Sequence, residues 1–195
     1  MAIFTNLAAV PQTVHGIWRS SKVKSTIAGH IHSARVQETQ SGQLVDIDVD
    51  NGVAISIKGF TGDGLEERLA TIAAVTDKIC VTANVPTVKT AMTKAQADET
   101  NFYTKAGQLA RSYEIYGDPT DGDIFGVGLH QFSNATASDI AVGAYVKVDG
   151  NGGWTAVAAK PDAEATGFIG QIHSIQKGLY YSVVNIFAIQ NKDVA

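Results

Sequence analysis

The chain has 195 residues, of which 45% are hydrophobic and 17% charged, with 19 glycines, one cysteine and a net charge of −4. This composition excludes a disordered chain, which carries much charge and few hydrophobic residues, and the single cysteine excludes an intrachain disulfide and a cysteine-based zinc site. No apolar run approaches the roughly 20 residues that a membrane-spanning helix needs, and the first residues lack a signal-peptide pattern. We therefore expect a protein made in a reducing cytoplasm, and the low charge favours a β-rich chain that hides part of its surface in an assembly.

The first 37 residues differ in charge from the rest of the chain. They contain four basic and no acidic residues, a net charge of +4, whereas the remainder carries 11 basic and 19 acidic residues, a net charge of −8. Segments of opposite charge attract different partners, so we predict that residues 1–37 form a basic arm that docks on the body or on another subunit. Because Trp and Arg are enriched at interface hot spots, the predicted contact residues are Trp18, Arg19, Lys22, Lys24 and Arg35.

Residues 44–58 alternate between apolar and polar side chains, which is the period of a half-buried strand. A two-residue turn at Asn51-Gly52 would mix apolar and polar residues on each face, whereas a three-residue loop over 50–52 gives one apolar face. Gly52 can then adopt the left-handed conformation that such a loop requires. The sequence therefore predicts a hairpin over 45–58 with Val49 opposite Val53, Ile47 opposite Ile55 and Val45 opposite Ile57.

One helix is predicted from about residue 64 to residue 75. Asp63 can cap its N-terminus, and Glu66 three residues later completes a pattern similar to a capping box. Its apolar residues share one helical face, namely Leu65, Leu69 and Ile72. A strand over 78–82 and a connector over 83–101 are expected to follow.

From residue 102 onward the sequence predicts β-structure. Residues 102–116 fit either one helix face or a hairpin around 105–108, and we prefer the hairpin because β-forming aromatic residues flank the turn. A turn cluster over 118–122 follows. Further strands are predicted over 124–127, 144–148, 154–157, 168–174 and 179–189. Strands at such intervals are typical of a barrel or a sandwich.

The predicted fold class is mainly β, a hairpin-rich barrel or sandwich with one short helix near 64–75 and an extended N-terminal arm. The predicted domains are the arm over 1–37, a β-rich module with one helix over 38–100, and a barrel or sandwich module over 101–195. The alternative is one continuous domain over 38–195.

Two groups of polar residues contain side chains that bind metal ions in other proteins, but neither meets the requirements of a metal site. The run Asp46, Asp48, Asp50 and Asn51 fails the spacing of a calcium-binding EF-hand loop, so we interpret it as a solvated strand face. His30 and His32 lie on one face of a predicted strand, but zinc or iron would need a third ligand nearby. We therefore interpret them as polar interface histidines.

No pattern in the sequence indicates catalysis. The chain has no nucleophile elbow, no phosphate-binding loop and no Cys/His pair at a recognisable spacing, and Cys80 lies in an apolar context that favours a buried, inert thiol. Four spread basic residues in the arm do not indicate nucleic-acid binding. We therefore predict no enzyme activity and no catalytic, cofactor-binding or metal-binding residues.

Four segments of the second half carry a resemblance to a known class of protein. They are residues 101–113 (NFYTKAGQLARSY), 122–127 (GDIFGV), 142–146 (VGAYV) with the glycine loop that follows, and 166–170 (TGFIG). These runs resemble the capsid-associated decoration or head-fibre proteins of tailed bacteriophages, over about residues 100–189. The chain departs from their pattern by inserting Pro119-Thr120 before Gly122.

The resemblance implies a virion structural protein, made in the host cytoplasm, that binds and stabilises an assembled capsid. Its implied partners are the major capsid protein and neighbouring copies of itself in a homo-oligomer, with no membrane contact. One alternative is a tail or baseplate β-protein of a phage. A second alternative, from a different class, is a cytoplasmic β-barrel that binds a small ligand.

Overall fold

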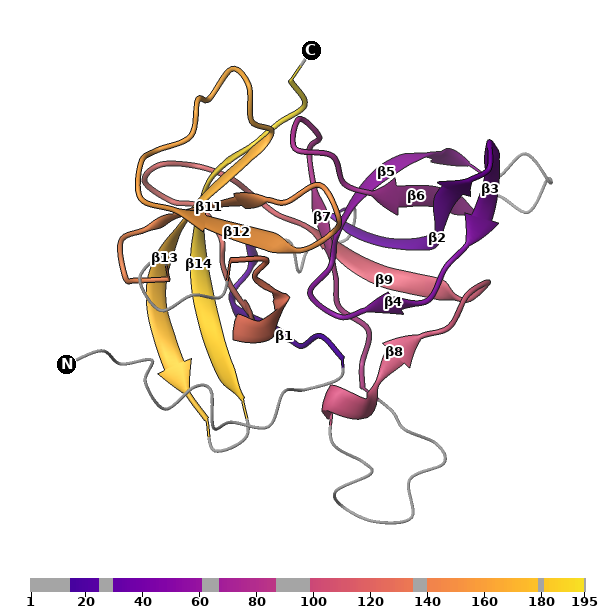
Figure 1. Cartoon of the computed structure of the whole chain (residues 1–195), viewed down its shortest axis with the longest axis horizontal. Helices are drawn as coiled ribbons and strands as arrows, with labels where there is room; N and C mark the ends of the chain where they lie inside the picture. The colour runs from indigo at the N-terminus through magenta and orange to yellow at the C-terminus, as the bar shows by residue number, and fades with distance from the viewer. Residues whose placement is uncertain are drawn as a thin grey trace.

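The computed structural model describes residues 15–24, 30–60, 67–86, 99–134, 140–178 and 181–194. These residues form two six-stranded sheets and a small two-stranded sheet (Figure 1). The first sheet has the strand order β1-β10-β14-β13-β11-β12. Its strands are β1 (Trp18–Lys22), β10 (Ile124–Gly128), β14 (Ser182–Asn191), β13 (Phe168–Lys177), β11 (Tyr145–Val148) and β12 (Trp154–Val157).

The second sheet has the strand order β3-β2-β6-β5-β7-β9, and an additional pairing of β2 with β9 closes it. Its strands are β3 (Gln43–Asp46), β2 (Ile31–Gln40), β6 (Arg68–Ile72), β5 (Ala54–Phe60), β7 (Cys80–Thr82) and β9 (Leu109–Glu114). The result is a closed barrel of five strands, β2, β6, β5, β7 and β9. β4 (Val49–Asp50) and β8 (Tyr103–Thr104) pair beside it.

The mainly-β fold class is confirmed. The described residues contain no α-helix, and two complete three-residue 3-10 turns lie at Glu99–Asn101 and Leu129–Gln131. No helix in these parts of the chain is long and apolar enough to cross a bilayer.

Two apolar clusters hold the fold together. The smaller one fills the barrel interior with small and branched side chains, Ala34, Val36, Val49, Ile55, Ala70, Cys80 and Ala110. The larger one lies between the barrel and the first sheet and contains residues of both. At its centre Trp154 packs against Phe125 and Phe168 in tilted and edge-on arrangements, which aromatic rings prefer. The indole Nε1 of Trp154 donates a hydrogen bond to the carbonyl of Gly52 across the two sheets, at 3.0 Å.

Several local predictions are confirmed in the second half of the chain. β11 and β12 form an antiparallel hairpin around the glycine loop, and β13 and β14 pair along their length. β10 begins at Ile124 as predicted, and the amide of Gly122 closes the preceding turn on the carbonyl of Asp118. In each of these hairpins the paired strands are neighbours in sequence, so local turn signals suffice to place them.

The helix predicted over 64–75 is wrong where the structure describes it. Residues 64–66 lie outside the described part, and Arg68–Ile72 is the strand β6, parallel to β2 and antiparallel to β5. In β6 the side chains of Leu69 and Ile72 point to opposite faces, and the fully buried Ala70 takes the inward position in the barrel. Closure of the barrel overrides the local helical pattern.

The hairpin predicted over 45–58 has most of its apolar face right but the wrong backbone partners, and Val45, predicted on that face, is 40% exposed. Val49, Val53, Ile55 and Ile57 all pack with the barrel interior, and Gly52 has the predicted positive φ, 79°. However, β3 pairs with β2, and β5 pairs with β6 and β7. The predicted three-residue loop is therefore a link between strands with different partners.

The hairpin predicted over 102–116 is correct in its turn only. The amide of Gln108 donates to the carbonyl of Lys105 at 3.0 Å, and extended strands flank this turn. β8 pairs with β4, whereas β9 pairs with β2 and β7. The predicted strand over 78–82 is observed as β7 from Cys80.

The prediction of a separate arm over 1–37 is wrong for its described part, residues 15–24 and 30–37. β1 pairs with β10 in the first sheet, and β2 contributes a whole strand to the barrel. Trp18 stacks on Phe125, with ring centroids 5.3 Å apart, and Ala34 is fully buried. The absence of acidic residues therefore does not mark a separate arm. The described strands of this segment are integral members of the two sheets.

Candidate functional site

A polar cluster lies at one end of the barrel, where β2 and β9 close it. His32 lies in β2 and His30 directly before its first residue, and both face the same way as the buried Ala34, because side chains alternate along an extended chain. Glu114 is the last residue of β9, and its amide donates to the carbonyl of His30 at 2.8 Å. The register pairs Glu114 with Cys80 of β7 on its other side. We call His30, His32, Lys78 and Glu114 the Glu114 cluster.

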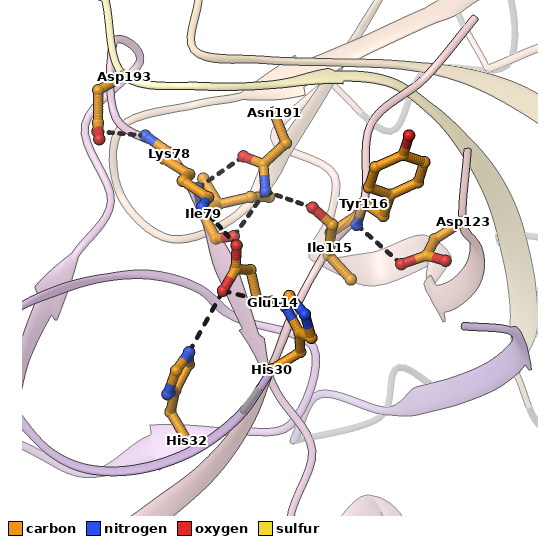
Figure 2. Close-up of polar contacts among 10 residues, drawn as sticks. All are labelled: His30, His32, Lys78, Ile79, Glu114, Ile115, Tyr116, Asp123, Asn191 and Asp193. Atoms are coloured by element: carbon orange, nitrogen blue, oxygen red, sulfur yellow. Dashed lines mark hydrogen bonds and ion pairs between the residues drawn. The ribbon is translucent and has the colours of Figure 1, made fainter. Parts of the chain in front are cut away.

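The two imidazoles approach the same carboxylate oxygen. His32 Nε2 lies 3.5 Å from Glu114 Oε2, and His30 Nδ1 lies 3.6 Å from that oxygen. The ammonium of Lys78 forms an ion pair with the other oxygen, Oε1. Figure 2 shows Glu114 between the two histidines, with Lys78 above it in this view. The carboxylate is thus held from one side and offers its second oxygen to both rings.

The electrostatics favour an ionised carboxylate at this position. Partial burial of Glu114 raises its pKa, but hydrogen bonds and charges from Lys78, His32 and His30 outweigh burial, so the net pKa lies below that of an ordinary glutamate. The side chains of Glu114 and His32 are only 22% and 12% exposed, whereas that of His30 is 55% exposed. The cluster is therefore a largely buried negative charge with one largely buried and one exposed imidazole beside it.

A surface cleft of about 480 Å³ opens beside the Glu114 cluster. The segment after β9 lines one wall, and the end of β14 lines another. Besides cluster residues, the lining includes Lys24, Tyr116, Asp121 and Asn191. The cleft gives small solutes in water access to the cluster.

Asn191 joins the elements around this cleft (Figure 2). Its Oδ1 accepts from the amide of Ile79 at 2.8 Å, and its Nδ2 donates to the carbonyls of Ile79 at 2.9 Å and Ile115 at 2.7 Å. The buried Asp123 accepts from the amides of Lys24 and Tyr116, at 2.7 and 2.8 Å. These bonds fasten the barrel to the first sheet beside the site.

Cys80 is buried in the barrel interior, as predicted. Burial and the nearby charge of Glu114 raise the pKa of its thiol to about 12. A thiol with such a pKa is protonated at neutral pH and reacts slowly with solution reagents.

The predicted contact residues of the arm have partners within the chain. The guanidinium of Arg19 hydrogen-bonds the carboxylate of Glu99, which raises the pKa of Arg19, and it reaches the Tyr181 hydroxyl at 2.9 Å. Lys24 forms an ion pair with Asp121.

The other three predicted contacts differ in exposure. Arg35 Nη2 donates to Glu67 Oε2 at 2.6 Å, Trp18 packs against the shared core, and Lys22 is exposed. Contact of these five residues with another protein stays a prediction.

The aspartates near 46–50 serve local structure. Asp48 accepts from the amide of Ala106 at 2.8 Å, and Asp50 accepts from His15 Nδ1 and from the amide of Gly16, each at 2.8 Å. They border a second groove of about 840 Å³ at the mouth of the barrel. Within the described residues no three His, Cys, Asp or Glu side chains form a ready-made metal site.

One surface of the barrel exposes apolar side chains. Leu44 on β3 lies opposite Thr39 of β2, and Leu109 on β9 lies opposite Arg35. Thr39 and Arg35 share the outer face of β2, so both leucines lie on that face, separated by four residues, or roughly 13 Å. Leu44 is 52% and Leu109 44% exposed. We call Leu44, Leu109 and Arg35 the outer β2 face.

Sequence reasoning found part of these sites. The sequence analysis singled out the His-x-His pattern and Arg35 but not Glu114. Glu114 follows His32 by 82 positions, and only the closure of the barrel brings the two side chains together. Comparison of the chain with protein-family models, with curated proteins and with solved structures gives no match.

Proposed function

We propose that this chain is a non-enzymatic virion structural protein that binds and stabilises an assembled phage capsid. The observation that carries the proposal is the outer β2 face, where two exposed leucines share a face with an arginine that is held by Glu67. Apolar side chains around an ordered arginine are a frequent composition of protein interfaces. The resemblance of residues 100–189 to capsid decoration and head-fibre proteins supplies the identity of the proposed partner.

The neighbouring strand β3 supports the same surface. Among the described strands, β3 pairs with β2 alone, so one of its edges offers backbone amides and carbonyls to another chain. An exposed edge strand can pair with a partner strand, which supplies backbone hydrogen bonds. A standard interface buries about 800 Å² per partner. We propose that the outer β2 face and β3 form the centre of an interface of this size. The partners we propose are the major capsid protein and neighbouring copies of this chain.

The test is binding to phage particles that lack this protein. Purified wild-type chain should co-sediment with the particles, and Leu44→Lys should weaken binding at least tenfold, because it places a charge in the proposed apolar contact. Val142→Lys is the matched control, since Val142 is also exposed but lies on the loop before β11. Equal binding of the wild type and Leu44→Lys would contradict the proposed surface.

The copy number in purified particles separates the capsid from the tail. Quantitative mass spectrometry should find this chain in proportion to the major capsid protein. A proportion matching tail or baseplate proteins would instead support the tail alternative, and absence from particles would contradict a virion role.

Packing argues against the small-ligand alternative in its simplest form. The barrel interior is filled by alanine, valine and isoleucine side chains, several of them fully buried. A five-stranded barrel filled in this way has its core where a ligand-binding barrel has a cavity.

A further inference from the structure

The hydrogen-bond phase of β3 determines which of its backbone groups face away from β2. Ser41 and Gly42 join the two strands, and both have positive φ, 52° and 83°. A two-residue turn of this kind makes the residues that flank it a hydrogen-bonded pair. Hydrogen-bonded and non-hydrogen-bonded pairs alternate along an antiparallel ladder. Val45 therefore bonds to β2, whereas Leu44 and Asp46 direct their amides and carbonyls to the opposite side.

The surroundings of β3 agree with this phase. The amide of Ile47 donates to the carbonyl of Val36 at 3.1 Å, as the position after Asp46 should. Among the described strands β3 pairs with β2 alone and lies at the outer end of its sheet (Figure 1). Leu44 is 52% and Val45 40% exposed. The free edge of β3 therefore offers two backbone donors and two acceptors beside exposed apolar side chains.

We propose that β3 pairs with β3 of a second copy of this chain, antiparallel and across a twofold axis at Val45. In this register Leu44 lies opposite Asp46 of the second copy, and symmetry repeats the pair. Each pair exchanges two backbone hydrogen bonds, so every outward donor and acceptor of the edge is used. The inference deepens the proposed function, in which copies of the chain are partners, and it rests on that function for the use of β3 as a contact strand.

The chain itself is the complement of this edge. Opposed residues of an antiparallel pair share a face, and Leu44 and Asp46 both belong to the outer face of β3. Val45 meets its own symmetry equivalent as a non-hydrogen-bonded pair, in which side chains approach most closely. Asp46 faces a leucine rather than a second carboxylate, and Gln37 Nε2 already donates to its Oδ1 at 2.7 Å. A twofold contact supplies this match without a second sequence.

Strand β3 lacks the features that block edge pairing. Its sequence, QLVD, contains neither lysine nor proline, and its register with β2 shows no bulge. Natural edge strands are usually protected by such features, and unprotected edges pair with other strands. Four residues from each copy are fewer than the roughly 20–30 of a standard interface. We therefore expect a reversible dimer with a dissociation constant in the micromolar range.

Disulfide formation tests the register. Val45→Cys should give a covalent dimer on oxidation, because the Cα atoms of a non-hydrogen-bonded pair lie about 4.5 Å apart, within reach of a disulfide. Gln43→Cys is the matched control, since Gln43 is exposed on the same strand. Its two copies would lie four positions apart along the strands, or roughly 13 Å, which a disulfide does not span. Cys80 is buried and does not compete.

Sedimentation equilibrium of the full chain tests the dimer without an added thiol. Leu44→Pro should weaken the dimer at least about tenfold, because proline removes one outward N–H from each copy. Its far-ultraviolet circular dichroism should match that of the wild type, since an edge strand tolerates proline where the N–H faces solvent. A wild type that stays monomeric at its highest soluble concentration would overturn the proposal. Equal disulfide yields for Val45→Cys and Gln43→Cys would also overturn it.

Co-sedimentation with phage particles separates this inference from the proposed function. A monomeric wild type that binds particles would overturn the β3 dimer and leave capsid binding standing, with β3 free to pair with a capsid strand. A wild-type dimer that does not bind particles would leave the β3 pairing standing and contradict the virion role.

Discussion

Replacing Asn191 by alanine should destabilise the protein strongly, although this side chain belongs to neither apolar cluster. Its amide makes three hydrogen bonds to backbone groups of Ile79 and Ile115. Both residues are essentially buried. Losing the partner of a buried polar group costs about 1–3 kcal/mol. Because the neighbouring cleft admits some water, we take the lower half of that range and expect a loss of about 3–6 kcal/mol for three bonds.

Urea denaturation followed by circular dichroism measures this loss. For a chain of this length a change of about 4 kcal/mol lowers the melting temperature by about 8–16 °C. Asn151→Ala is the matched control, because Asn151 is an exposed asparagine in the β11–β12 loop. A loss below about 1 kcal/mol for Asn191→Ala, or equal losses for the two variants, would refute the view that Asn191 fastens the barrel to the first sheet.

Three further predictions concern other parts of the fold. A chain lacking residues 1–37 should be insoluble or unfolded, because it loses β1 and most of β2; a soluble β-type spectrum would contradict this. Gly52→Val should cost more than about 2 kcal/mol in thermal denaturation, since φ is 79° and an added Cβ would lie 2.5 Å from the carbonyl of Ile17. Because the pKa of Glu114 is lowered in the folded state, its charge stabilises the protein above the unfolded pKa of about 4.3. That contribution is lost as pH falls through the folded pKa. The stability difference between wild type and Glu114→Gln should therefore shrink from pH 7 to below pH 4, and a constant difference would argue against it.

Sequence patterns predicted the elements whose partners are close in the chain. The β11–β12 hairpin was placed from strand alternation and a glycine loop, because one turn determines both strands. The apolar face was also correct from Ile47 to Ile57, since period-two alternation reports burial whatever the backbone partner; Val45, predicted on the same face, is exposed. Its register was wrong, because β5 pairs with β6 and β7, and alternation carries no information about which strand is the neighbour.

Long-range pairings account for what the sequence did not reveal. The basic composition of residues 1–37 suggested a separate arm, but charge says little about whether a strand completes a sheet. The Glu114 cluster depends on a long-range pairing too. The sequence pattern singled out the two histidines but could not indicate which carboxylate lies beside them. Strand β6 shows a further error: apolar spacing of four and seven positions predicted a helix face, but Leu69 and Ile72 lie on opposite faces of a five-residue strand that closure of the barrel requires.

The packing between barrel and first sheet predicts that both unfold together. The larger apolar cluster draws residues from the two sheets, and Trp154 bonds the Gly52 carbonyl across them. Separate modules would show separate transitions. Tryptophan fluorescence reports the shared core through Trp18 and Trp154, whereas labelling of Cys80 by a thiol reagent reports opening of the barrel interior. The two signals should change at the same urea concentration, because the larger apolar cluster is built from residues of both sheets. Exposure of Cys80 at a urea concentration that leaves the fluorescence unchanged would show instead that the barrel opens on its own.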